Sequence, residues 1–302
     1  MKRHLWIALF AILFLTPTAQ AKLKVVTTTP DLRVLASEIG GDFIEVESIA
    51  KGTQDYHYIE AKPSYMLKIN KADLVISVGL DLEVGWLPSI LQGARNPKVN
   101  PGSQGYLEAG SLVRRLEVPT GNITRADGDV HPAGNPHYSL DPIAMGSVAV
   151  GIADRLAEMD PSHGAYYREK GQSIQVRFTK KSAAWLERLK KSKITQIITY
   201  HKTFSYFFER FQIANPAILE PKPGIPPTAA HVLEVIGLMK THKISLVLVE
   251  NYFDATIGKR IQDEVPGARI ASVPVAVEGA SEVKNLDDLY EKLVSVIEGK
   301  NP

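Results

Sequence analysis

Residues 23–49 read LKVVTTTPDLRVLASEIGGDFIEVESI. The β-branched run over 23–29 predicts a buried strand. Pro30 follows, and the apolar residues after it recur at helical spacing as far as the glycine pair 40–41, which predicts a helix. Residues 43–49 alternate between apolar and polar and predict a second strand. A strand, a helix and a strand in this order indicate a βαβ unit with parallel strands.

The same alternation continues along the chain and predicts an α/β fold with two lobes, each a mostly parallel sheet flanked by helices. Further strands are expected at 72–79, 194–200, 213–219, 244–249 and 269–275. Further helices are expected at 64–72, 84–91, 204–211, 228–241, 254–264 and 286–298. The segment 96–134 is rich in Gly, Pro and Asn, which predicts loops with short strands.

One long helical stretch separates the two lobes. It opens with Pro142 in a first-turn position and restarts at Pro161. The helical pattern then continues for roughly 30 residues, which corresponds to about 45 Å of helix. A helix of this length predicts a rigid strut between two bodies. We therefore expect a lobe at 22–160, a linking helix at 161–190 and a second lobe at 191–302.

The first 21 residues, 1–21, are expected to be a cleavable signal peptide. They contain a basic start, an apolar run over 5–16 and the small-x-small motif Ala19-Gln20-Ala21. The apolar run is shorter than the roughly 20 residues that a membrane-spanning helix needs. No cysteine follows for lipid attachment. We expect cleavage near Ala21 and a free protein in the periplasm.

The composition is that of a globular protein, with 302 residues, 44% hydrophobic and 23% charged. The absence of cysteine excludes disulfides, thiolate metal ligands and a thiol nucleophile. The chain has 35 Lys and Arg against 33 Asp and Glu, so loss of Lys2 and Arg3 leaves it formally neutral. A neutral protein has no electrostatic signature of nucleic-acid binding. The GxSxG, HExxH, GxxxxGKS and GxGxxG motifs are also absent from the sequence, so we do not expect an enzyme.

Three histidines lie where a parallel sheet places ligand sites, near the ends of strands. His57 comes after the second strand, His137 lies just before the long helical stretch, and His201 directly follows the strand at 194–200. A single such histidine is usually structural, but three from both halves of an exported chain indicate a metal site. Neutral imidazole is the commonest nitrogen ligand of zinc. His131, six residues before His137, is expected on the loop surface, with transient recruitment of metal as the alternative.

The chain resembles the periplasmic metal-binding component of zinc and manganese ABC importers, the cluster A-I substrate-binding proteins. The opening VVTTTPDLRVLASEIGGD is similar to the family's first strand and helix. The segments DYHYIEAKPSYM, NPHYSLDP and YHKTFSYFFERF resemble its three ligand motifs, and LVLVEN resembles a later strand. Four short motifs in the same order and spacing make the resemblance specific.

The resemblance implies two α/β lobes joined by one rigid helix, with the metal in the cleft between them. His57 and His137 would come from the first lobe and His201 from the second. Manganese-binding relatives often have Glu at the third position. Three imidazoles favour Zn²⁺, because Mn²⁺ prefers oxygen-rich sites.

The fourth ligand stays open. Many relatives supply an Asp after the last strand, but here 272–279 reads SVPVAVEG. Glu278, Glu250 at the end of a buried strand, and water are the three alternatives. Glu60 is a candidate to orient His57 through a hydrogen bond.

The resemblance implies a monomeric carrier that captures Zn²⁺ and delivers it to an inner-membrane ABC permease with its ATPase. Transported Mn²⁺ is less favoured. Two alternatives stay in view, a manganese- or iron-selective carrier of the same family, and a periplasmic zinc-dependent enzyme or metal buffer.

Overall fold

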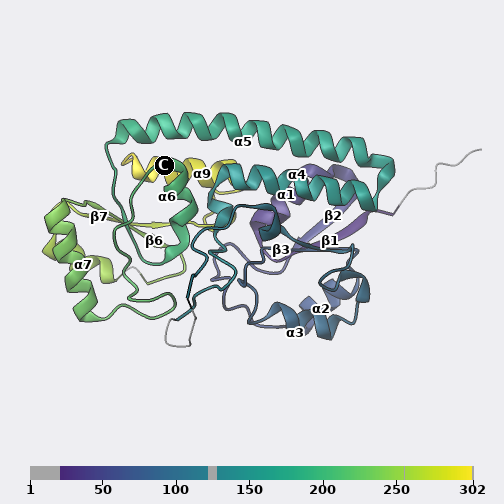
Figure 1. Ribbon diagram of the computed structural model, residues 1–302, viewed down its shortest axis with the longest axis horizontal. Coiled ribbons are helices and arrows are strands. Elements are labelled where there is room, and N and C mark those ends of the chain that lie inside the picture. Colours follow the sequence, from purple (N-terminus) through teal and green to yellow (C-terminus); the bar gives the residue numbers. More distant parts are fainter. Residues whose placement is uncertain (1–20, 122–127, 255, 301–302) are drawn as a thin grey trace, which may run out of the picture.

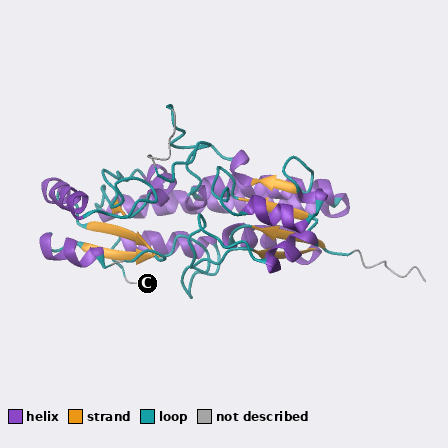
Figure 2. Ribbon diagram, turned by 90° about the horizontal axis from the view of Figure 1, so that it is seen from below, coloured by secondary structure: helices purple, strands orange, loops and turns teal. Residues whose placement is uncertain are grey.

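The computed structural model describes residues 21–121, 128–254 and 256–300. Residues 1–20 of the expected signal peptide therefore lie outside the described part. Within that part, no helix combines the length and apolar character that crossing a bilayer requires. Two sheets lie at opposite ends of an elongated molecule, as Figure 2 shows.

The first sheet contains four parallel strands in the order β2-β1-β3-β4. The strands are β1 (Leu23–Thr27), β2 (Ile44–Ser48), β3 (Leu74–Ser77) and β4 (Tyr106–Glu108). Helices α1 (Pro30–Gly40) and α4 (Pro142–Met159) pack on one face, and α2 (Pro63–Asn70) and α3 (Leu87–Ala94) pack on the other. The β-branched residues of β1 and β3 point to both faces, which explains why these strands read as continuous apolar runs.

The second sheet contains three parallel strands in the order β5-β6-β7. The strands are β5 (Ile198–Thr199), β6 (Leu246–Glu250) and β7 (Arg269–Val273). Helices α7 (Ala229–His242) and α8 (Ile257–Glu264) cover one face, and α6 (Ser205–Phe211) and α9 (Leu286–Ile297) cover the other. Single 3-10 turns occur at Gly41–Phe43, Pro97–Val99, Ala109–Leu112, Tyr138–Leu140, Pro161–His163 and Lys202–Phe204.

The strand expected at 213–219 is wrong as a continuous element. Only isolated bridges pair this segment with the β5 region, Ala214 with Gln196 and Ile218 with Thr199. Pro216 lies between the two bridges and has no N–H to donate to a ladder. The side chain of Asn215 donates instead to the carbonyl of Ile197 at 2.8 Å. The ladder is therefore interrupted at the Asn-Pro pair.

Helix α5 (Gly164–Ser192) runs along both lobes, as Figure 1 shows. Its Arg177 pairs with Glu38 of α1 in the first lobe and with Asp287 of α9 in the second. Near its end, Trp185 donates to Glu291 of α9 at 2.9 Å. The predicted fold class, two α/β lobes and one long helix, is confirmed. The lobe boundaries at residues 160 and 190 stay a prediction.

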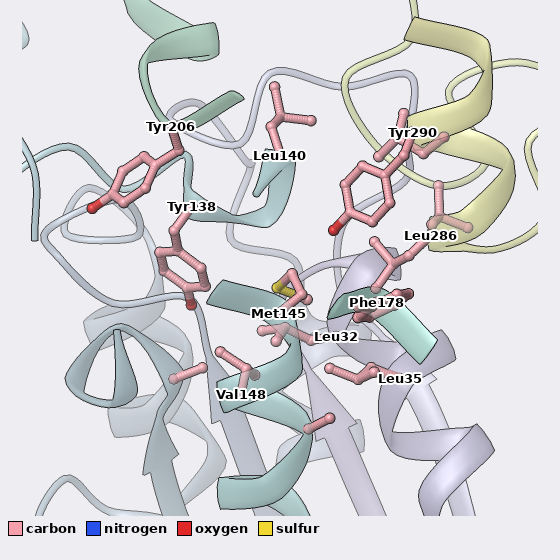
Figure 3. Packing of buried hydrophobic residues seen from close by; sticks show 14 of the residues in the cluster. Leu32, Leu35, Tyr138, Leu140, Met145, Val148, Phe178, Tyr206, Leu286 and Tyr290 are labelled. Carbon is pink, nitrogen blue, oxygen red and sulfur yellow. The ribbon is translucent and has the colours of Figure 1, made fainter. Parts of the chain in front are cut away.

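Besides a separate hydrophobic cluster within each lobe, one large hydrophobic cluster spans both lobes. Figure 3 shows it, with side chains from α1, α4, α5, α6 and α9 in contact: Leu32, Leu35, Met145, Val148, Phe178, Tyr206, Leu286 and Tyr290. Tyr138 in the middle of this cluster donates to the carbonyl of Val78 in the first lobe at 2.9 Å. Tyr290 of the second lobe donates to the carbonyl of Ser139 at 2.8 Å. Movement of one lobe against the other must therefore disrupt buried packing.

Close packing of α4 on α5 depends on Gly171. A Cβ atom there would lie 2.7 Å from the Cβ of Ala153 and 3.0 Å from the carbonyl oxygen of Ala149. We expect Gly171→Ala to lower the free energy of unfolding by about 1–3 kcal/mol, because this overpacking outweighs the gain in helix propensity. Gly237, in α7, has nothing within 4 Å of the same position. Gly237→Ala is the matched control and should stabilise the protein by up to about 1 kcal/mol. Urea unfolding of both variants measures the two changes in the free energy of unfolding. Equal changes of the same sign would show that Gly171 is not needed for close packing.

Candidate metal centre

His57, His137 and His201 converge between the two lobes. Their ligand atoms all lie within 4.8 Å of one another. Their ring centres are separated by 5.3 Å (His57 and His137), 5.6 Å (His57 and His201) and 5.5 Å (His137 and His201). Three imidazoles on one tetrahedral zinc ion, with Zn–N bonds of about 2.0–2.1 Å, have ring centres roughly 5 Å apart. The spacing of the triad therefore fits a shared ion with little adjustment.

His57 lies in the loop between β2 and α2. Its backbone N–H donates to Oδ1 of Asp55 at 3.0 Å, and its Nδ1 lies 2.6 Å from the same oxygen. Burial raises the pKa of Asp55, but the hydrogen bonds and charge of His57 outweigh this and lower it. A carboxylate that accepts from Nδ1 leaves Nε2 with its lone pair for a metal. The prediction that Glu60 orients His57 is wrong, since Glu60 is 80% exposed and pairs with Lys62.

His137 immediately precedes the 3-10 turn that leads into α4. Its backbone N–H donates to Oδ1 of Asn135 at 2.9 Å, and the Asn135 amide donates to the carbonyl of Lys202 at 3.0 Å. The segment that carries His137 is thus hydrogen-bonded to the segment that carries His201. Nε2 of His137 is buried and has no hydrogen-bond partner among the described residues. Burial, followed by the neighbouring His57 and His201, holds the pKa of His137 well below its usual value, which keeps the ring neutral.

His201 follows β5 and is buried. Its Nδ1 lies 2.6 Å from Oε2 of Glu220, a carboxylate that is itself only 3% exposed. Burial lowers the pKa of His201, but the hydrogen bond to Glu220 and the charge of Glu250 outweigh it, so the pKa is raised. The hydrogen bond between Nδ1 of His201 and Glu220 again leaves Nε2 directed toward the rings of His57 and His137. Asp55 and Glu220 are candidate functional residues that the sequence analysis did not single out.

The two carboxylates considered as fourth ligands lie in different surroundings. Glu250 ends β6 and is 0% exposed, and neither of its oxygens has a hydrogen-bond partner among the described residues. Burial raises its pKa to about 7, opposed by the nearby His201. It is not one of the three residues that form the close group, and its role as a ligand stays a prediction. Glu278 is turned toward Arg33 of α1, at 2.7 Å.

The expectation that His131 lies on the loop surface is wrong, because its side chain packs against His57. Its Nε2 lies 3.1 Å from Nε2 of His57, and the two rings are stacked with centres 5.1 Å apart. Burial, followed by the charges of His57 and His201, lowers the pKa of His131 to about 4. The sequence shows only a histidine in a Gly- and Pro-rich loop, and loop composition does not reveal where such a loop packs.

A groove with a volume of about 600 Å³ opens beside this histidine pair. Its wall includes His57 and His131, with the exposed Tyr58 and the acidic side chains of Asp81 and Asp129. The negative charges attract cations toward the group of imidazoles. The groove therefore connects the metal centre with the solvent.

Asp31 of α1 contributes to the closed, inner side of the centre. It shares a cavity of about 30 Å³ with His57 and His137, and its Oδ1 accepts from the backbone N–H of Val277 in the second lobe at 2.8 Å. Burial raises its pKa to about 7, against the opposing hydrogen bond from Val277. One buried carboxyl group thus joins the two lobes next to the candidate ligands His57 and His137.

The raised pKa of Asp31 predicts a pH dependence of stability. Between its ordinary value of 3.8 and about 7, the folded protein holds a proton that the unfolded chain releases. Stability of the metal-free protein should therefore fall as pH rises through this window, by up to about 1.4 kcal/mol per pH unit. Asp31→Asn retains the acceptor and removes the titration. Urea unfolding at pH 5 and pH 8 should show a smaller loss in the variant, and parallel losses would contradict this assignment.

The sequence matches the family model described as ZnuA, zinc-uptake complex component A, periplasmic, over residues 25–298. The iron-binding protein YfeA of Yersinia pestis is 25% identical over 287 residues, which are 91% of this chain and 84% of that protein. The manganese ABC transporter substrate-binding lipoprotein PsaA of Streptococcus pneumoniae is 25% identical over 300 residues, 93% of this chain and 89% of that protein. A crystal structure of ZnuA superimposes with a TM-score of 0.78 at 20% identity and covers 93% of this chain and 100% of that one.

Proposed function

This chain belongs to the ZnuA family of periplasmic zinc-uptake components, and from that premise we propose that it captures Zn²⁺ between its two lobes and delivers it to an ABC permease. The family and its relatives are substrate-binding proteins of metal transporters rather than enzymes. The relatives are named for different metals, iron, manganese and zinc. The choice of zinc therefore rests on the chemistry of this chain's own residues.

The observation that carries the proposal is the all-imidazole triad. His57, His137 and His201 offer three nitrogen atoms within 4.8 Å of one another. The carboxylate of Asp55 faces Nδ1 of His57, and that of Glu220 faces Nδ1 of His201. Imidazole nitrogen suits Zn²⁺, whereas Mn²⁺ is better served by carboxylate, carbonyl and water oxygens. Because the triad comes from both lobes, the bound ion would join them.

We also propose where the protein acts. The chain is exported, cleavage falls near Ala21, and the protein acts in the periplasm as a monomer. Relatives are named as substrate-binding lipoproteins of ABC transporters, which supports an inner-membrane permease with its ATPase as the partner. Glu250 remains the carboxylate candidate for completing the coordination.

Zinc titration of the chelator-stripped protein tests the triad. We expect one tightly bound Zn²⁺ per chain, weaker Mn²⁺, and loss of tight binding in the double variant His57→Ala/His201→Ala. His242 is exposed at the end of α7, so His242→Ala should bind zinc like the unchanged protein. Tight zinc retained by the double variant, or manganese bound more tightly than zinc, would contradict the proposal.

Glu220 offers a test of the orientation of His201. Glu220→Gln retains an oxygen acceptor for Nδ1 but removes the charge, so zinc affinity should fall by about 10–100-fold. Glu234 of α7 is exposed and pairs with His231 of the same helix. Glu234→Gln is therefore the matched control. Competition with a zinc chelator measures the zinc affinity of both variants. Unchanged affinity in Glu220→Gln would show that this carboxylate has no part in metal binding.

A further inference from the structure

Resting on the proposed function, we propose that His131 supplies a fourth imidazole to the zinc ion and closes the coordination position that water or a carboxylate would otherwise fill. The site would then hold zinc through four nitrogen atoms. His131 differs from the triad in one respect, because it belongs to a loop that faces the groove.

The geometry beside His57 fits two ligands of one ion. The Nε2 atoms of His57 and His131 are 3.1 Å apart. Two nitrogen ligands of a tetrahedral zinc ion are separated by about 3.4 Å. The ring of His131 is 6.5 Å from that of His137, against 5.3–5.6 Å within the triad. For His131 to share an ion with His137 as well as with His57, its ring must therefore move toward that of His137.

The protonation of the pair is consistent with this role. Asp55 accepts from Nδ1 of His57, which leaves the lone pair of His57 Nε2 directed at His131. With Nδ1 of His57 donating to Asp55, a hydrogen bond between the two Nε2 atoms requires His131 to be the donor. When zinc enters, it takes the place of this proton, and His131 carries its proton on Nδ1 instead. Both Nε2 atoms are then free to bind, and no proton is lost from either neutral ring.

The backbone around His131 is held by both lobes. The N–H of Asp129 donates to the carbonyl of Pro223 in the second lobe at 2.8 Å. The N–H of Ala133 donates to the carboxylate of Asp81 in the first lobe at 2.8 Å. The side chains of Tyr58 and Asp129 are also hydrogen-bonded. His131 therefore lies in a short strap, residues 128–134, that is hydrogen-bonded to both lobes.

The strap is also linked to the ligand from the second lobe. Pro223 belongs to the turn in which the N–H of Gly224 donates to Oε2 of Glu220 at 3.2 Å, and the same oxygen faces His201. A displacement of His201 and its carboxylate is thus transmitted to the strap. Formation of a complete site requires both lobes in one relative position.

Glu250 is less suited to the fourth position. Neither Glu250 nor His131 belongs to the group of close ligand atoms. Nε2 of His131 lies 3.1 Å from Nε2 of His57, whereas Glu250, 0% exposed at the end of β6, has no hydrogen bond to any of the three histidines. A fourth imidazole has two consequences. It increases the preference for Zn²⁺ over Mn²⁺, because it adds another nitrogen ligand in place of oxygen. It also covers the ion on the groove side, which slows its release.

The test compares His131→Ala, Glu250→Gln and His242→Ala in the full mature chain, with the double variant His57→Ala/His201→Ala as the reference for loss of the site. Zinc X-ray absorption counts the imidazoles, and cobalt spectra report the tetrahedral ligand field. Zinc transfer to a chelator gives affinity and release rate. We expect His131→Ala to lose one imidazole from the spectrum, to release zinc faster and to bind it more weakly, by at least the roughly 10–100-fold that loss of an outer-shell partner costs. His242→Ala should match the unchanged protein.

The outcomes separate the two proposals. If His131→Ala retains the imidazole count and zinc affinity while the double variant loses zinc, the role of His131 is wrong and the carrier function stands. If Glu250→Gln alone alters the cobalt spectrum, the fourth ligand is the carboxylate and the proposal is overturned. If the double variant also retains tight zinc, the proposed function itself fails. Urea unfolding of the metal-free variants confirms that each one folds.

Discussion

In the site that we propose, three imidazole nitrogens from segments far apart in the chain must lie within bonding distance of one ion, and the rest of the structure serves this constraint. His57 follows β2, His137 precedes α4 and His201 follows β5. None of these loops holds its histidine alone. Asp55 orients the first ring, Asn135 holds the backbone of the second, and Glu220 orients the third. Each hydrogen bond removes rotational freedom before the metal arrives, so less of the binding free energy is lost on ordering.

The relative position of the lobes is constrained just as closely. Besides the shared hydrophobic cluster, Asp141 at the start of α4 forms a two-pronged pair with Arg210 of α6, with both distances 2.8 Å. Arg33 of α1 pairs with Glu278 of the second lobe, and Asn251 of the second lobe donates to the carbonyl of Gly52 in the first lobe at 3.5 Å. A Cβ atom on Gly52 would approach the carbonyl oxygen of Val277 to 2.0 Å, so only glycine permits this contact. We therefore expect metal release through local displacement of loops rather than a wide rotation of the lobes.

Much of this arrangement follows from local patterns in the sequence. Buried parallel strands and amphipathic helices have strong periodic signals, so the two lobes, the long helix and the three strand-end histidines were all predictable. The strand at 213–219 failed because the Asn215-Pro216 pair breaks a ladder that hydrophobicity alone suggests. Glu220 and His131 could not be recognised, because their partners are 19 and 74 residues away and only tertiary packing brings them together. Asp55 was within reach, since an aspartate two residues before a histidine commonly forms a local turn.

In the proposed complex, one zinc ion is held between the lobes by Nε2 atoms from both of them. Anomalous scattering at the zinc edge, from crystals of the zinc-loaded protein, locates this ion. We predict a single strong peak about 2.0–2.1 Å from the Nε2 atoms of His57, His137 and His201. A peak elsewhere on the molecule, or one bound by histidines of a single lobe, would contradict the account.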